Sequence, residues 1–165
     1  NNTIGYSKGI DILCQLLEHS ASNISGWISY SYLKSKRKNN YLENYGYYYT
    51  DWDQTHTIST YINKKLDHEW HSTIKILLGS GKPYSSSNTT FNDKRKKATL
   101  TLDIWFTKNK IDLLDKYNWI KSSKFNIGVV NILNRKSFLV ETESSQDEEQ
   151  TLLPLSPILA VSIEF

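Results

Sequence analysis

Hydrophobic and polar residues alternate along several segments of this chain. In residues 99–106 every even position is apolar, while Thr101 and Asp103 lie between these positions. A period of two is typical of a strand with one apolar and one polar face. The same period, in places less regular, runs through six further segments, which are residues 9–16, 26–32, 56–66, 70–78, 125–133 and 159–165. The pattern predicts an all-β chain of seven strands, with helix limited to one short turn near residues 111–117.

The connections between the predicted strands alternate in length. Residues 18–23, 67–69 and 108–118 form the shorter links, and residues 35–55, 79–97 and 134–157 form long polar ones. In an up-and-down meander alternate connections lie at the same end, so the long loops gather at one end and the short turns at the other. Transmembrane β-barrels sort their connections in this way. Strands of about 9–11 residues also suit a tilted membrane crossing.

Aromatic residues near the strand ends point in the same direction. Barrels place aromatic girdles at both water–lipid interfaces, although aromatic residues also favour strands in general. We interpret six residues as girdle candidates: Trp27, Trp70, Tyr84, Trp105, Trp119 and Phe165.

Composition excludes several classes of protein. The 165 residues include 20 Lys and Arg against 17 Asp and Glu, so the charge is nearly balanced and no nucleic-acid partner is expected. No run of 18 apolar residues occurs, which argues against a transmembrane helix. The single Cys14 excludes a disulfide framework and a cysteine-rich zinc site. Because the chain starts at Asn1 rather than Met, we expect a mature or internal piece of a longer protein.

The sequence offers little for catalysis. No Gly-x-Ser-x-Gly motif occurs, and residues 79–84 lack the spacing of a phosphate-binding loop. His68 and His71 are three positions apart, which on a strand places them on opposite faces, so they would converge on a metal only within a turn. We therefore expect no enzyme activity, no cofactor and no metal site.

Four stretches resemble, in order, the C-terminal part of a TonB-dependent outer-membrane receptor. These are Gly-Trp-Ile-Ser-Tyr-Ser-Tyr at residues 26–32, Asp-Trp-Asp-Gln-Thr-His-Thr at 51–57, Gly-Ser-Gly-Lys-Pro-Tyr at 79–84 and Val-Asn-Ile-Leu-Asn-Arg-Lys at 130–136. The chain also ends on Ile-Glu-Phe, and Phe165 resembles the terminal aromatic that outer-membrane assembly machinery recognises. In that family the Asp-Gln-x-His segment is a feature of strand start or assembly rather than of catalysis.

The resemblance implies an antiparallel up-and-down transmembrane β-barrel of 22 strands around an N-terminal plug. Residues 1–165 would be the C-terminal part of that barrel, with about seven strands. The implied function is uptake of a scarce nutrient, such as a siderophore, glycan or peptide, across the bacterial outer membrane. The implied partners are outer-membrane lipid and lipopolysaccharide, the remaining strands and plug, and the TonB complex through parts absent from this chain. A surface lipoprotein as a further partner stays open.

Two sets of loop residues are candidates for binding. Tyrosine and tryptophan stack on sugars, aromatic siderophores or peptides while their polar atoms form hydrogen bonds, and the predicted ligand contacts are Tyr41, Tyr45, Tyr47, Tyr48, Tyr49 and Trp52. Cations at the outer interface pair with lipopolysaccharide phosphates, and the predicted contacts are Lys36, Arg37, Lys38, Arg95, Lys96 and Lys97. Packing of the loop onto itself and simple solvation of the charges are the alternatives. We interpret the acidic run in residues 141–149 as mostly solvated.

Two other functions remain open from the sequence. A soluble β-sandwich could bind glycans with its Tyr-rich loop, and potential glycosylation sites at Asn23 and Asn88 suit a secreted protein. A small self-contained outer-membrane barrel is the other alternative. The sandwich would bury the apolar face between two sheets, whereas either barrel would turn that face outward.

Overall fold

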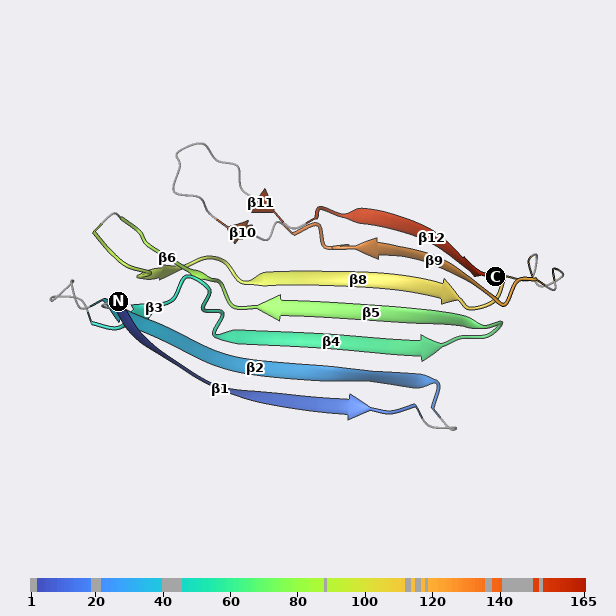
Figure 1. Ribbon diagram of the computed structural model, residues 1–165, viewed down its shortest axis with the longest axis horizontal. Helices are drawn as coiled ribbons and strands as arrows, with labels where there is room; N and C mark the ends of the chain where they lie inside the picture. The colour runs from blue at the N-terminus through green and yellow to red at the C-terminus, as the bar shows by residue number, and fades with distance from the viewer. Residues whose placement is uncertain are drawn as a thin grey trace. The chain divides into compact units, whose positions relative to one another are not determined.

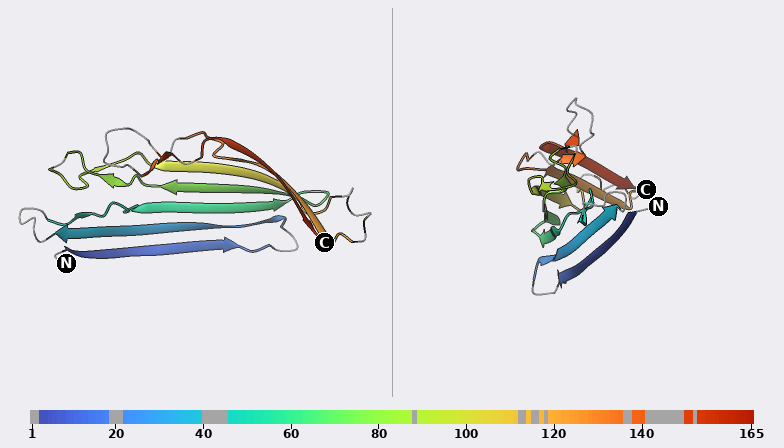
Figure 2. Two further views of the ribbon diagram at one scale, coloured as in Figure 1. Left: turned by 45° about the horizontal axis from the view of Figure 1, so that its top comes forward. Right: turned by 90° about the vertical axis from the view of Figure 1, so that its left-hand side faces the viewer.

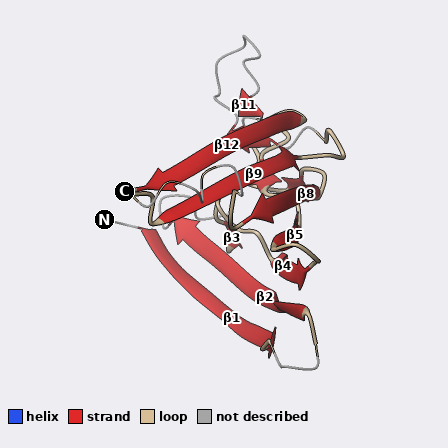
Figure 3. Cartoon of the chain, turned by 90° about the vertical axis from the view of Figure 1, so that its right-hand side faces the viewer, coloured by secondary structure: helices blue, strands red, loops and turns tan. Residues whose placement is uncertain are grey.

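Seven long strands dominate the computed structural model, as the alternation predicts. It describes residues 3–18, 22–39, 46–87, 89–111, 114, 117, 119–135, 138–140, 150–151 and 153–165. The long strands are β1 (Thr3–Leu16), β2 (Ile24–Asn39), β4 (His56–Lys65), β5 (Trp70–Gly79), β8 (Thr99–Lys108), β9 (Ser122–Val130) and β12 (Ser156–Glu164). Figure 3 draws the described elements as strands and loops, with no helix among them. The predicted all-β class is therefore confirmed.

The long strands form an antiparallel meander. Their order in the sheet is β1-β2-β4-β5-β8-β9-β12, which is also their order along the chain (Figure 1). Strands β1 and β12 stand at opposite ends of this order, and the described strands do not close into a barrel.

Five short strands lie in the long connections. Strand β3 (Tyr48–Tyr49) pairs with β2, β6 (Pro83–Tyr84) pairs with β7 (Lys94–Arg95), and β10 (Phe138–Val140) pairs with β11 (Gln150–Thr151). The alternation does not predict them, because two or three residues are too few to show a period.

The chain divides into two compact units, and each is described by itself. Unit 1 comprises Asn1–Leu13, Ser29–Ser59 and Leu77–Thr99. Unit 2 comprises Cys14–Ile28, Thr60–Ile76 and Leu100–Phe165. Within unit 2, β9 and β12 lie side by side and pair from end to end (Figures 1 and 2).

The register in unit 2 separates an apolar from a polar face. Ile127 of β9 stands opposite Phe106 of β8 and Leu159 of β12. Its neighbour Asn126 stands opposite Thr107, whose hydroxyl donates a 2.8 Å hydrogen bond to the Asn126 amide oxygen. Residues directly opposite in an antiparallel pair share a face. One face of these strands is therefore apolar and the other polar, as the alternation predicts.

The apolar face is exposed rather than buried. Among the described residues, Pro83 is the one buried apolar side chain, and no other aliphatic or aromatic side chain is buried. Ile28 is 49% exposed and Ile163 is 38% exposed, and Leu102 and Ile104 are half-buried. The described strands therefore do not form the apolar core that a folded β-sandwich requires.

Two of the predicted girdle residues lie on the polar face, so that part of the girdle prediction is wrong. Trp105 stands opposite Gly128, and its ring covers the space that a side chain there would fill. This is the face of Thr107, because Trp105 and Thr107 are two positions apart on β8. Trp27 stacks on Tyr61, with ring centroids 6.4 Å apart, and alternation places both on the polar side of their strands. Closeness to a strand end does not determine which face of the strand a side chain occupies, because successive residues point to opposite faces.

Candidate functional site

The buried positions of the described chain are almost all polar residues or glycines, and most lie in the stretches that resemble the receptor family. Asp53 and Asn131 are each 1% exposed. Asp53 belongs to the Asp-Gln-x-His stretch, and Asn131 belongs to the Asn-Ile-Leu-Asn-Arg stretch. Gly79 and Gly81, in the Gly-Ser-Gly stretch, are also buried. These motifs therefore form the interior of the described parts.

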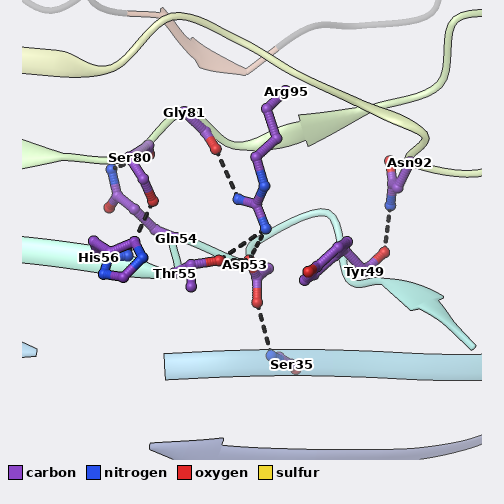
Figure 4. Close-up of polar contacts among 10 residues, drawn as sticks. All are labelled: Ser35, Tyr49, Asp53, Gln54, Thr55, His56, Ser80, Gly81, Asn92 and Arg95. Atoms are coloured by element: carbon purple, nitrogen blue, oxygen red, sulfur yellow. Dashed lines mark hydrogen bonds and ion pairs between the residues drawn. The ribbon is translucent and has the colours of Figure 1, made fainter. Parts of the chain in front are cut away.

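Asp53 is the centre of a buried polar cluster within unit 1 (Figure 4). Its carboxylate accepts hydrogen bonds from the backbone N–H of Ser35 at 2.7 Å and from the hydroxyl of Thr55 at 2.7 Å. The guanidinium of Arg95 forms an ion pair with the same carboxylate at 2.6 Å. We call Ser35, Asp53, Thr55 and Arg95 the Asp53 clamp. It joins β2, the connection that precedes β4, and β7.

The Asp53 carboxyl is held in its charged form. Burial alone would raise its pKa, because a carboxylate loses hydration in the interior. The hydrogen bonds from Ser35, Arg95 and Thr55 and the charge of Arg95 outweigh that effect, so the pKa of Asp53 lies below its ordinary value. At neutral pH the clamp is therefore a charged pair with each Asp53 oxygen hydrogen-bonded.

The second and third stretches of the resemblance contact each other beside the clamp. Gln54 donates its amide N–H to the carbonyl of Ser80 at 3.1 Å. The Ser80 backbone N–H donates to the carbonyl of His56 at 2.8 Å, and the His56 N–H donates to the Ser80 hydroxyl at 3.0 Å. A Cβ at Gly79 would lie 2.0 Å from the Gln54 amide nitrogen, so a larger residue would displace that side chain.

Gly81 allows an even closer approach. A Cβ at this position would lie 1.7 Å from the carbonyl oxygen of Lys96. The Gly81 carbonyl accepts a 2.9 Å hydrogen bond from Arg95. Arg95 therefore holds the Gly81 turn and Asp53 with one side chain, which extends the clamp to the β6–β7 hairpin.

The residues predicted as ligand contacts lie next to those predicted as lipopolysaccharide contacts. The ring of Tyr49 has the Lys36 ammonium 4.7 Å away and the Arg95 guanidinium 4.4 Å away. Tyr48 lies under Arg37 at 5.3 Å. Cation–π contacts of this kind stabilise ring and cation together. The sequence predicted the ligand contacts and the lipopolysaccharide contacts as two separate groups, whereas in unit 1 members of the two groups contact each other.

Two further predicted ligand contacts occupy different surroundings. Trp52 is 68% exposed, and the Lys82 ammonium lies 4.8 Å from its ring. Tyr47 packs edge-on against Tyr6 of β1, with ring centroids 5.3 Å apart. Tyr41 and Tyr45 lie outside the described residues. The ligand-contact prediction for this set stays a prediction.

Two of the predicted lipopolysaccharide contacts are bound to carboxylates. Arg37 forms an ion pair with Asp51 at 2.9 Å, and Arg95 is committed to the clamp. Lys38 lies near the end of β2, and Lys96 and Lys97 follow β7. Asn92 strengthens this region, because its buried amide donates to the carbonyl of Tyr49 at 2.6 Å and to Asp51 at 2.8 Å.

Unit 2 contains a second buried polar centre at Asn131. Its backbone N–H donates to Asp103 at 2.9 Å, and its amide N–H donates to the carbonyls of Arg135 and Leu153 at 3.0 Å each. Asn131 adopts a left-handed backbone with φ of 50°, which asparagine tolerates better than most residues. Asn134 has φ of 48° and accepts a hydrogen bond from a backbone N–H just before β12. Asn131 therefore connects β8, the end of β9 and the approach to β12.

The remaining candidate residues are two histidines considered for metal binding, His68 and His71, and the C-terminal Phe165. His71 Nε2 lies 2.9 Å from the Asn109 amide nitrogen, and His68 sits in a turn with φ of 56°. In the part of the chain that the structure describes, no cluster of three His, Cys, Asp or Glu could hold a metal ion. Phe165, the predicted assembly signal, is 65% exposed and stacks on Trp119 with ring centroids 5.3 Å apart.

None of the described residues belongs to a helix that is long and apolar enough to cross a membrane. No protein-family model, curated protein or solved structure matches the chain.

Proposed function

We propose that residues 1–165 form a sector of a transmembrane β-barrel in the bacterial outer membrane. The observation that carries this proposal is the inverted burial of the described strands: apolar side chains on one face are exposed or half-buried, and nearly all of the buried side chains are polar. In water such a face would drive association or aggregation, whereas in a bilayer it faces lipid. The alternation of short and long connections supports the same proposal.

The two terminal strands support a larger barrel. Within the described part of the chain, β1 pairs on one side only, with β2, and β12 pairs on one side only, with β9. Unpaired backbone groups in lipid cost several kcal/mol each, so further strands must complete the sheet. Seven antiparallel strands leave β1 and β12 running in the same direction. An all-antiparallel barrel therefore needs an odd number of additional strands, which a total of 22 satisfies.

Within this framework we propose that the chain belongs to a TonB-dependent receptor that imports a scarce nutrient. Support comes from the position of the resembling stretches: the Asp-Gln-x-His and Gly-Ser-Gly segments contact each other and hold two long connections to the sheet. An uptake receptor needs ordered external loops to select its substrate. The exposed Trp52 is our leading candidate for substrate contact.

Cysteine labelling on β12 tests the orientation of the faces. On a Cys14→Ser background, Leu159→Cys and Val161→Cys report the apolar face, and Ala160→Cys and Ser162→Cys are matched controls on the other face. In native membranes we expect a water-soluble maleimide to label the controls and to spare the apolar face. A soluble protein whose apolar-face cysteines react only after unfolding would instead indicate a sandwich and overturn the proposal.

A second experiment separates the receptor from a small barrel. Unheated samples of outer membrane should contain a heat-modifiable band larger than this chain, detected with an antibody against it. Uptake of the imported nutrient should also stop when TonB is removed. A heat-modifiable band of about 19 kDa without a larger parent would contradict the receptor proposal while leaving the membrane proposal intact.

A further inference from the structure

Two lysines of unit 1 face each other across neighbouring strands. The hydroxyls of Ser7 on β1 and Ser35 on β2 lie 2.8 Å apart. A Cβ at Gly9 would lie 3.2 Å from the α-carbon of Leu33. Two residues further along β1 thus correspond to two residues back along β2, as an antiparallel register requires. Lys8 therefore stands opposite Lys34. Side chains at such positions start about 5 Å apart on the same face.

A third lysine completes this cluster. Lys36 is two positions from Lys34 on β2, so it shares its face, and it stands opposite Tyr49 of β3. The Lys36 ammonium lies 4.7 Å from the Tyr49 ring, and that of Lys34 lies 5.9 Å from the same ring. On β1, the Lys8 ammonium lies 5.9 Å from the ring of Tyr6. We call Lys8, Lys34 and Lys36 the lysine triad.

No lysine of the triad forms an ion pair within the described part of the chain. The ion pairs there involve Arg37, Lys65 and Arg95, and none involves a triad lysine. Like charges directly opposite each other destabilise a sheet. An external anion between the ammonium groups would remove this repulsion, and the tyrosine hydroxyls nearby could donate further hydrogen bonds to it.

The strand face beyond the triad indicates what kind of anion fits. Ile10 and Ile12 follow Lys8 on the same face of β1, and they are 64% and 52% exposed. Positive charge at one end of the face and exposed aliphatic side chains along it match a molecule with an anionic head and hydrocarbon chains. A free anion would use only the charged end.

We propose that the lysine triad binds the phosphate groups of a phosphorylated lipid in the outer leaflet, with the acyl chains lying along Ile10 and Ile12. This inference rests on the proposed membrane location and adds a partner and a site to it. It also differs from the predicted lipopolysaccharide contacts, which include neither Lys8 nor Lys34, and of which Arg37 and Arg95 are bound to carboxylates.

Lipid binding by the protein purified from its native membrane into dodecyl maltoside micelles tests the proposal. Isothermal titration calorimetry would compare bisphosphorylated lipid A, the same lipid without its phosphates, and inorganic phosphate. The test variant is Lys8→Gln/Lys34→Gln/Lys36→Gln. The matched control, Lys64→Gln/Lys75→Gln/Lys121→Gln, removes the same charge from exposed lysines elsewhere.

We expect the test variant to bind bisphosphorylated lipid A roughly a hundredfold more weakly, because each lysine near an anionic lipid surface contributes about a factor of five. The control variant should lose much less, and 0.5 M salt should weaken binding by the wild type. The triad proposal would be overturned if both variants lost the same affinity for bisphosphorylated lipid A. It would also be overturned if the wild type bound the lipid without phosphates as tightly as the bisphosphorylated one. Full competition by millimolar inorganic phosphate would indicate a free anion and overturn the lipid.

These results are distinguishable from failure of the proposed function. The protein could lie in the membrane with its apolar face shielded from maleimide and yet show no preference for phosphorylated lipid A. That outcome would refute the triad proposal alone. A chain that is soluble with that face buried refutes both.

Discussion

Replacing Asp53 with alanine should loosen the two long connections of unit 1. The Asp53→Ala change removes the acceptor for the Ser35 N–H, the Thr55 hydroxyl and the Arg95 guanidinium. Breaking a fully buried ion pair costs about 3–5 kcal/mol. The Arg95 side chain is 31% exposed and keeps its bond to Gly81, so part of its hydration returns. We therefore expect a loss of about 3 kcal/mol, at the lower end of that range.

Hydrogen exchange measures this loss at amides that do not contact Asp53. The Leu33 N–H donates to the Thr55 carbonyl at 3.0 Å, and the Thr50 N–H donates to the Ser35 carbonyl at 3.1 Å. Both bonds join β2 to the connection that contains the clamp. A loss of about 3 kcal/mol should accelerate exchange at these amides by roughly a hundredfold.

Asp51 provides the matched control. Its ion pair with Arg37 is at the surface, with the two side chains 56% and 38% exposed. Exposed pairs contribute about 0–1 kcal/mol, and Asp51→Ala also removes one of the two acceptors of the Asn92 amide, which keeps its bond to the Tyr49 carbonyl. We therefore expect this change to accelerate exchange clearly less than Asp53→Ala does. Equal acceleration in Asp51→Ala and Asp53→Ala would refute the reasoning, because the effect would then not depend on burial.

Three further predictions concern the buried Gly81, the buried Asn131 and the hydrogen-bonded carboxylate of Asp93. Gly81→Ala should open the β6–β7 hairpin to proteolysis, because its Cβ would lie 1.7 Å from a carbonyl oxygen, whereas Gly46→Ala, with no atom within 4 Å, should have no effect. Asn131→Ala should lower the free energy of unfolding by about 2–4 kcal/mol, measured by urea titration in detergent, since it leaves buried groups without hydrogen-bond partners; an unchanged midpoint would contradict this role. Hydrogen bonds from Ser86 lower the pKa of Asp93 to about 2, so the stability it gives its turn should persist above pH 3.8 and disappear as pH falls toward 2. Exchange at the Ser86 amide across that pH range, corrected for intrinsic rates, measures this, and a constant corrected rate would contradict it.

The strands could be predicted because each has one apolar and one polar face. Leu100, Leu102, Ile104 and Phe106 repeat every second position, and β8 extends over Thr99–Lys108. Such a pattern depends only on neighbours along the chain. It fixes the number and type of the long strands, and it would do so in a soluble or a membrane protein alike.

The Asp53 clamp could not be predicted in the same way. Asp53 is 18 positions from Ser35 and 42 positions from Arg95, and no periodicity connects residues at these distances. In the sequence, Arg95 belongs to a basic run within a polar loop, and such a run is typical of charges exposed to solvent. The signal that could have located the clamp was the resemblance itself: a motif of polar residues and glycines suggests buried hydrogen bonds and close backbone contacts.

This difference bears on how the loops could select a substrate. The described strands have no buried apolar core on which the loops could pack, and ring contacts such as Tyr47 on Tyr6 supply only part of the support. Directional hydrogen bonds and ion pairs therefore have a larger part in positioning these loops. Unit 1 follows this principle, because Asp53, Asn92 and Arg95 hold the connections to β2 and to each other. Trp52 takes no part in that network and remains 68% exposed. Under the proposed receptor function, selection can therefore act on the exposed ring while the Asp53 clamp stays the same, so such loops could change specificity without losing their fold.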